Sequence, residues 1–112
     1  MEYLIKNAEE FIETGEDSFK KERWNAAVAN FFRAIVNLCD FIIYRQIKII
    51  PKNHTERFEL LEKYFPAIYK DVSELFNKYR DSYNLRLSKS DAEIIKKYLY
   101  ELKDSLETEK RT

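Results

Sequence analysis

A chain of 112 residues is long enough to bury one hydrophobic core but not two, so residues 1–112 are expected to form a single domain. Apolar residues make up 45% of the chain and include eight Phe and eight Tyr, a composition that excludes intrinsic disorder. Lys and Arg balance Asp and Glu to a formal net charge of zero, so no overall field would drive the protein onto nucleic acid or an anionic membrane.

The scarcity of Cys, His and Gly excludes several kinds of site. Cys39 is the only cysteine, so no internal disulfide can form. His54 is the only histidine, which excludes a Cys/His zinc cluster and the paired Glu-x-x-His segments of a di-iron bundle. Gly15 is the only glycine, so no Gly-rich loop can hold a nucleotide phosphate. We therefore expect neither a metal nor a cofactor.

Nothing in the chain predicts export or membrane insertion. No charged and then apolar leader opens it. The most apolar long window, residues 26–43, is interrupted by four polar side chains: Asn30, Arg33, Asn37 and Asp40. We expect a cytoplasmic protein without a membrane span.

Apolar residues in the first half of the chain recur with helical spacing. The first stripe predicts one helix over residues 2–21, with Gly15 inside it where another helix approaches closely. The next predicts a helix over residues 23–47 that is apolar on more than one face and therefore central. Pro51 would stop any continuation of this helix.

The second half contains three further helical patterns. Asn53 and Glu56 can form a capping box for a short third helix, and Pro66 suits the first turn of a fourth. We expect the inner face of the fourth helix to carry Ile68, Val72, Leu75, Phe76, Tyr79 and Tyr83. After a connection over residues 85–89, Ser90 and Glu93 predict a second capping box for a last helix that frays after residue 107. The fold class is therefore all-α, an up-down bundle of four main helices plus a short one.

Two residues stand out as candidate polar sites. Asp40 interrupts an apolar stripe, so it either pairs with a cation such as Arg33 or Arg80 or lines a polar pocket. His54 has three interpretations: it meets Arg80 across a cleft, it is bonded locally at the start of a helix, or it binds an anion together with Arg57. We prefer the two interpretations that require no catalysis.

The end of the fourth helix is basic. Arg80, Arg86 and Lys89 lie there, where cations offset the helix dipole or contact phosphate. Tyr79 and Tyr83 are four residues apart and so lie on one helix face. Such a pair more often belongs to a core than to a platform for stacked bases.

Several elements, in this order, resemble the HEPN superfamily of helical domains over about residues 2–106. They are Glu9-Glu10-Phe11, Trp24-Asn25-Ala26-Ala27, Phe32-Arg33-Ala34-Ile35, the His54 loop and Tyr79-Arg80-Asp81-Ser82-Tyr83. The resemblance implies a HEPN-like bundle in which an acidic residue of the second helix, here Asp40, faces Arg80. Many members are metal-independent ribonucleases that place a histidine four to six residues after this arginine, but no histidine follows Arg80.

The sequence thus predicts a prokaryotic, non-catalytic module that binds a nucleotide, an RNA or a partner protein. The expected ligand contacts are Asp40, His54, Arg57, Arg80 and Arg86. The resemblance implies a homodimer and a role as accessory half of a nucleotidyltransferase or toxin–antitoxin pair. One alternative is a metal-independent ribonuclease that uses Arg80 and His54. The other is a purely structural helical interaction protein.

Overall fold

The computed structural model describes residues 2–111, with side chains as far as residue 108. Five helices follow one another: α1 Glu2–Lys20, α2 Trp24–Ile47, α3 His54–Tyr64, α4 Pro66–Asp81 and α5 Lys89–Arg111. Residues 2–111 contain no strand, so the predicted all-α helical bundle is confirmed.

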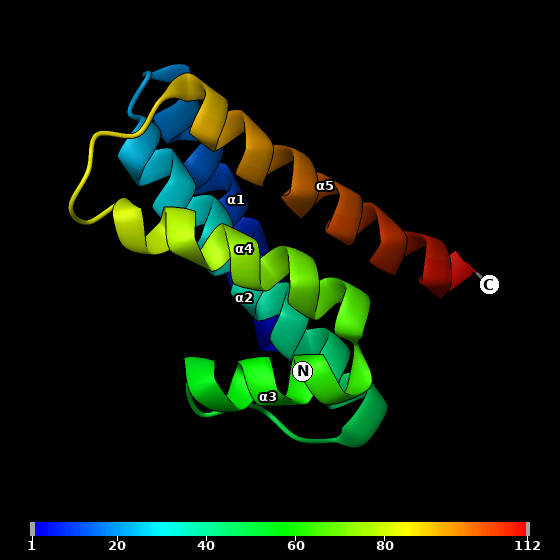
Figure 1. Cartoon of the computed structure of the whole chain (residues 1–112). Coiled ribbons are helices and arrows are strands. Elements are labelled where there is room, and N and C mark those ends of the chain that lie inside the picture. The colour runs from blue at the N-terminus through cyan, green and yellow to red at the C-terminus, as the bar shows by residue number, and fades with distance from the viewer. Residues whose placement is uncertain (1, 112) are drawn as a thin grey trace.

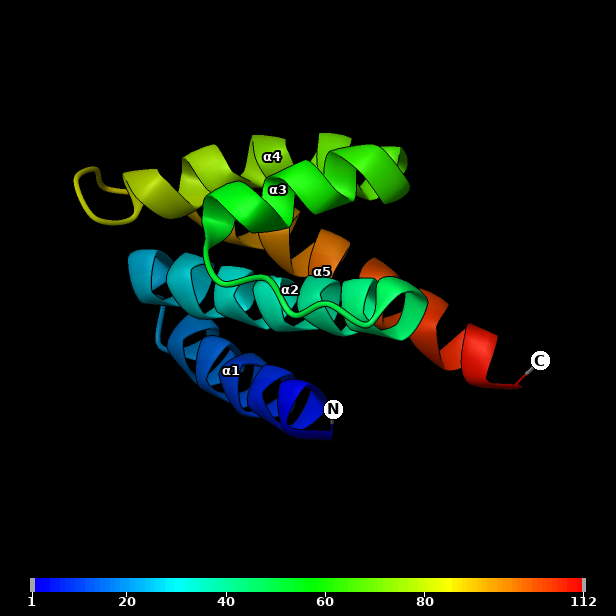
Figure 2. The same cartoon turned by 90° about the horizontal axis from the view of Figure 1, so that it is seen from below.

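Helix α2 is the centre of the bundle. It contacts each of the other four helices, most extensively α1 and then α5 (Figure 1). Seen from below, α1, α2 and the α3–α4 pair form successive layers, with α5 behind α2 (Figure 2). This position explains why α2 is apolar on more than one face.

By length and composition alone, α2 could also cross a membrane. In this fold, however, 67% of its most apolar window is buried inside the bundle. The core helix of a soluble protein passes the same test, so the bundle itself accounts for these apolar residues.

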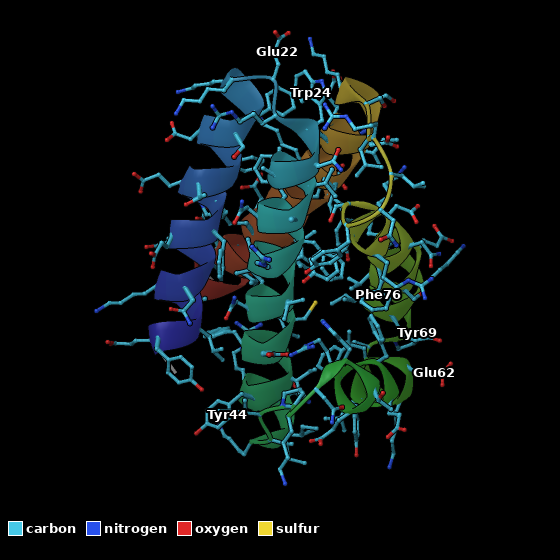
Figure 3. All side chains as sticks on the ribbon, turned by 90° about the vertical axis from the view of Figure 1, so that its left-hand side faces the viewer. Glu22, Trp24, Tyr44, Glu62, Tyr69 and Phe76 are labelled. Atoms are coloured by element: carbon cyan, nitrogen blue, oxygen red, sulfur yellow. The ribbon has the colours of Figure 1, made fainter. Side chains whose placement is uncertain are left out.

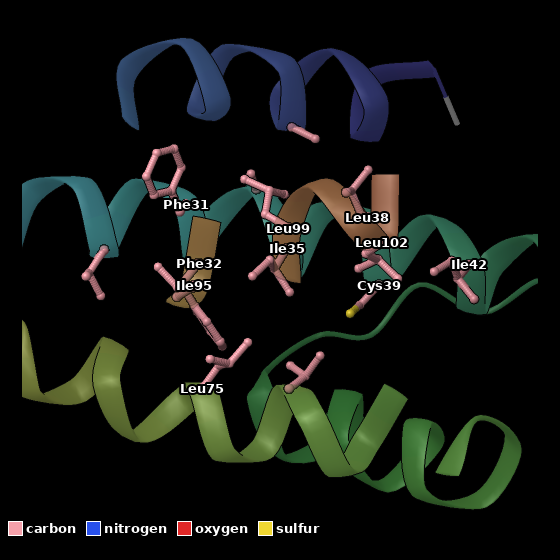
Figure 4. Packing of buried hydrophobic residues seen from close by; sticks show 14 of the residues in the cluster. Phe31, Phe32, Ile35, Leu38, Cys39, Ile42, Leu75, Ile95, Leu99 and Leu102 are labelled. Carbon is pink, nitrogen blue, oxygen red and sulfur yellow. The ribbon is translucent and has the colours of Figure 1, made fainter. Parts of the chain in front are cut away.

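The core is built around α2 (Figure 4). Phe31 and Phe32 are both fully buried, and Phe32 contacts Phe76 and Tyr79 of α4. Phe31 packs on Gly15 of α1 so closely that a Cβ added there would lie 2.6 Å from its ring. The predicted close approach of a helix at Gly15 is therefore confirmed. Other buried members of the core are Ile35, Leu38, Ile43, Leu61, Val72, Ile95 and Leu99.

Two helices end on residues with positive φ that are not glycine. Glu22 has φ 58° and closes α1 as a Schellman motif, because its N–H donates to Phe19 while the next N–H donates to Ser18. Lys48 has φ 61° and donates to Tyr44 at the end of α2. The second helix thus ends before Pro51 is reached.

One predicted capping box is confirmed in part and the other is wrong. The Asn53 side chain accepts a hydrogen bond from the Glu56 N–H at 2.8 Å, as expected for the cap of α3. Helix α5, however, is capped by Ser88 and Asp91, each of which accepts from the other's N–H. The Ser90–Glu93 box is therefore placed two residues too late. Asp91 also bonds Lys78 of α4 at 2.7 Å, a tertiary contact that favours the earlier cap.

One further expectation is corrected at a helix end. Helix α4 ends at Asp81, so Tyr83 lies beyond the inner face that it is expected to line and is 64% exposed. Helix α5 extends to Arg111, and Thr112 lies outside the described residues.

Candidate functional site

A buried ion pair joins α2 to α3. Arg57 donates from Nε to Asp40 Oδ1 at 2.6 Å and from Nη2 to Asp40 Oδ2 at 2.9 Å. Both residues are buried, with relative exposures of 7% and 5%. The two parallel hydrogen bonds fix the position of the guanidinium group as well as neutralising the carboxylate.

The partner of Asp40 corrects the sequence prediction. Neither Arg33 nor Arg80 pairs with it. The segment over residues 48–53 runs back along α2, so α3 begins beside the middle of that helix (Figure 2). This return path brings Arg57 next to Asp40, whereas the resemblance implied Arg80.

Arg57 also fixes the protonation of His54. Its Nη1 lies 2.8 Å from His54 Nδ1. A guanidinium group can only donate, so Nδ1 must be the acceptor and the ring proton must lie on Nε2. Burial and then the Arg57 charge lower the pKa of His54, against a smaller opposite effect of Asp40. The imidazole is therefore neutral at pH 7, and it forms a local hydrogen bond with Arg57 near the start of α3.

Aromatic rings surround His54. Its ring centroid lies 5.0 Å from that of Phe76, 6.2 Å from that of Phe58 and 6.3 Å from that of Tyr79. Phe76 and Phe58 are themselves in edge contact at 5.2 Å, so this cluster joins α3 to α4. Figure 3 shows Phe76 on the side of α4 nearest α2. The rings restrict the orientation that the imidazole can take.

Arg33 lies beside two phenols. Burial acts to lower its pKa, but the neighbouring Tyr83 and Tyr79 hydroxyl groups outweigh this effect and raise it. The two hydroxyl oxygens are 2.8 Å apart and share a hydrogen bond. Burial and this hydrogen bond raise the pKa of Tyr79, whereas the same bond lowers the pKa of Tyr83. No described carboxylate forms an ion pair with Arg33, so its charge stays uncompensated.

A polar clamp positions the loop that carries Tyr83. Asn25 Nδ2 donates to the carbonyl oxygens of Ser82 and Leu85 at 2.9 and 2.6 Å. Its Oδ1 accepts from the Leu87 N–H at 2.9 Å. This role is not predictable from the sequence, since an Asn at the start of a helix gives no sign of a partner about 60 positions away.

Several of these groups line an open groove of about 370 Å³ between α1, α2, the 48–53 segment, α3 and α4. Its apolar lining consists of Phe11, Phe32, Val36 and Tyr79. Its polar lining consists of Arg33, Asn37, Lys52, Asn53, His54 and Arg57. Among residues 2–108, no carboxylate lines it. A volume of this order is typical of small-ligand sites.

A second, shallower hollow lies along α5 and differs in charge. It is lined in part by Lys89, Glu93, Lys96 and Phe19. Lys96 pairs with Glu16 of α1 at 2.8 Å and also lies over the Phe19 ring. Cations here are largely compensated, so the groove beside α3 is the better candidate.

The structure brings three of the five predicted ligand residues together and separates the other two. Asp40, His54 and Arg57 form one hydrogen-bonded chain at the groove. Arg80 is exposed, bonds to Asn77 and lies over the Phe76 ring at 5.3 Å. It shares that ring with His54, but no direct contact joins the two among the described residues. Arg86 is exposed in the loop after α4.

Within residues 2–108, no group of three or more His, Cys, Asp or Glu side chains is placed to hold a metal ion. Comparisons with protein-family models, curated proteins and solved structures find no match to this chain. The kinship with HEPN domains therefore stays a prediction from the sequence.

Proposed function

We propose that this protein is a non-catalytic module that binds a phosphorylated ligand, a nucleotide or an RNA, in the groove between α2, α3 and α4. The observation that supports this is the charge on the groove wall. Arg57 is neutralised by Asp40 beneath it, whereas Arg33 and Lys52 have no described carboxylate partner. Two positive charges beside the partly buried aromatic side chains of Phe11 and Tyr79 suit a phosphate attached to a base.

The test is binding at increasing salt concentration. For a short single-stranded RNA, the logarithm of the binding constant should fall with the logarithm of the salt concentration with a slope of about −1.4, since two phosphate contacts contribute roughly −0.7 each. Replacing Arg33 and Lys52 together by Gln should abolish most of that slope. The matched control is Lys97→Gln on α5, which removes one exposed charge away from the groove and should leave binding unchanged.

The same experiment separates the alternatives. A ribonuclease would cleave the RNA in the presence of EDTA and lose that activity in His54→Ala. A purely structural protein would show no salt-sensitive binding of RNA or nucleotide. Either outcome would contradict the proposal, because a binding module must hold the ligand and leave it intact.

The wider setting follows the HEPN resemblance and is proposed on that basis. We propose a homodimer in the cytoplasm that serves as accessory half of a nucleotidyltransferase or toxin–antitoxin pair. Light scattering on the purified chain tests the dimer. A single-chain mass at micromolar concentration would contradict it without affecting the groove.

A further inference from the structure

The His54–Arg57–Asp40 chain uses every nitrogen of one guanidinium group. Nε and Nη2 bind the two Asp40 oxygens, and Nη1 binds His54 Nδ1. The Nε2–H of His54 forms no hydrogen bond with any described residue. One buried ion pair thus holds a neutral imidazole with its remaining donor free.

Two cations lie on the same groove as this imidazole. Arg33 lines the groove next to Tyr79, has no described carboxylate partner, and carries five N–H groups that can donate to a ligand. Lys52 is exposed, lines the groove and has no described ion-pair partner. The groove therefore combines two uncompensated positive charges with a neutral donor on a third side chain.

We infer that the groove recognises a terminal phosphate, with Arg33 and Lys52 binding its charge and the His54 Nε2–H donating to one of its oxygens. This inference rests on the proposed function and names the ligand group that the site selects. A terminal phosphate carries nearly two negative charges at pH 7 and three free oxygens. An internal phosphodiester carries one charge and has two of its oxygens esterified, so it matches the groove less well.

Arg57 acts in this site as a positioning residue. Three of its five N–H groups bind the carboxylate and the imidazole, and Asp40 neutralises its charge, so Arg33 and Lys52 are left to bind the charge of the ligand. Its part is to keep the His54 proton on Nε2. A neutral imidazole without this contact would exchange between its two tautomers and present a donor for only part of the time.

The experiment compares single-stranded RNAs of one sequence that end either in a phosphate or in hydroxyl groups, with fluorescence anisotropy as the readout. The terminal phosphate should tighten binding by about tenfold or more, as charge-assisted hydrogen bonds do. Adenosine monophosphate against adenosine, and inorganic phosphate as competitor, show whether the phosphate must belong to an RNA end.

The outcomes separate this inference from the proposed function. Equal binding of both RNAs would overturn the terminal-phosphate inference and leave the binding module intact. Failure of every ligand to bind would overturn both. Lys97→Gln serves again as the control variant and should keep the preference for phosphate.

The positioning role has its own readout, because the chain contains a single histidine. The imidazole ¹⁵N shifts should report the Nε2–H tautomer in the unmodified protein. Arg57→Lys keeps a positive charge next to Asp40 but has no guanidinium group to reach both Asp40 and His54. This variant should show both imidazole tautomers and lose most of the preference for the RNA that ends in a phosphate. An Nδ1–H tautomer in the unmodified protein would overturn the role even if the variant failed to fold.

Discussion

The two sides of α2 are built on opposite principles. The side that faces α1 is closely packed at Gly15, where Phe31 is seated directly on the glycine. The side that faces α3 and α4 contains a buried ion pair, a histidine and an open groove. One helix can serve both purposes because side chains three or four residues apart share a face, so a packing surface on one face supports a polar site on another.

The two sides of α2 also contribute differently to the stability of the fold. Burial of an apolar side chain such as Phe31 stabilises a fold in proportion to the apolar area removed from water. A buried ion pair contributes much less, since the loss of hydration offsets most of the attraction between the charges. Asp40 and Arg57 therefore fit a role in orienting His54 better than a role in stabilising the bundle.

The largest expected effect comes from breaking the ion pair. Asp40→Ala leaves the Arg57 charge buried without a partner, which should lower the free energy of unfolding by about 3–5 kcal/mol in urea denaturation. Replacing both residues, as in Asp40→Leu with Arg57→Met, should restore most of that stability. A double variant as unstable as the single one would show that the pair is a stabilising element after all.

The packing between α1 and α2 is tested at Gly15. In Gly15→Ala the new methyl group would meet the Phe31 ring, so we expect a loss of about 1–3 kcal/mol from overpacking. Phe31→Leu should make room, and the double variant should lose less than the sum of the two single losses in the same denaturation experiment. Additive losses would mean that the two side chains do not compete for one space.

A smaller effect is expected at Asn25, which holds the loop carrying Tyr83. Asn25→Ala removes three hydrogen bonds at a partly solvent-exposed site and should cost about 1–2 kcal/mol. Asn30→Ala on the same helix removes only a local bond to Ala26 and should cost less than about 0.5 kcal/mol. Equal losses would argue against the clamp.

The smallest effect is a dependence of stability on pH. The pKa of His54 is lowered in the folded protein, so the folded state binds fewer protons than the unfolded state, whose histidine titrates near ~6.5. Stability should therefore be full above that value and decrease as the pH falls from 7 toward 5. In His54→Gln, the free energy of unfolding should no longer decrease over this pH range. An unchanged decrease in the variant would show that carboxylates, and not His54, cause the pH dependence.

Much of the fold could be predicted because helical periodicity is a local property. The central position of α2 follows from its several apolar faces. The close contact at Gly15 follows because the helical spacing of apolar residues continues through this glycine, so the glycine lies inside a helix. The cap of α5 was misplaced because Ser88 and Ser90 are equally suitable in sequence. The salt bridge from Asp91 to Lys78, a contact between two helices, is present only with the earlier cap.

The candidate site could be predicted only in part. Asp40, His54 and Arg57 stood out as polar residues in unusual places, but their connection depends on the path of residues 48–53. Chain direction after a helix end is not encoded in spacing, so Arg80 was an equally reasonable partner for Asp40. The roles of Arg33 and Asn25 depend on residues more than 45 positions away along the chain, so the local sequence gives no sign of them.

The most direct measurement is a titration of RNA with a terminal phosphate into protein labelled with ¹⁵N at its single histidine. If the groove is the ligand site, the His54 Nε2 resonance should move and saturate at the concentration at which anisotropy reports binding. Binding that saturates while this resonance stays unchanged would place the ligand elsewhere on the molecule and contradict the site.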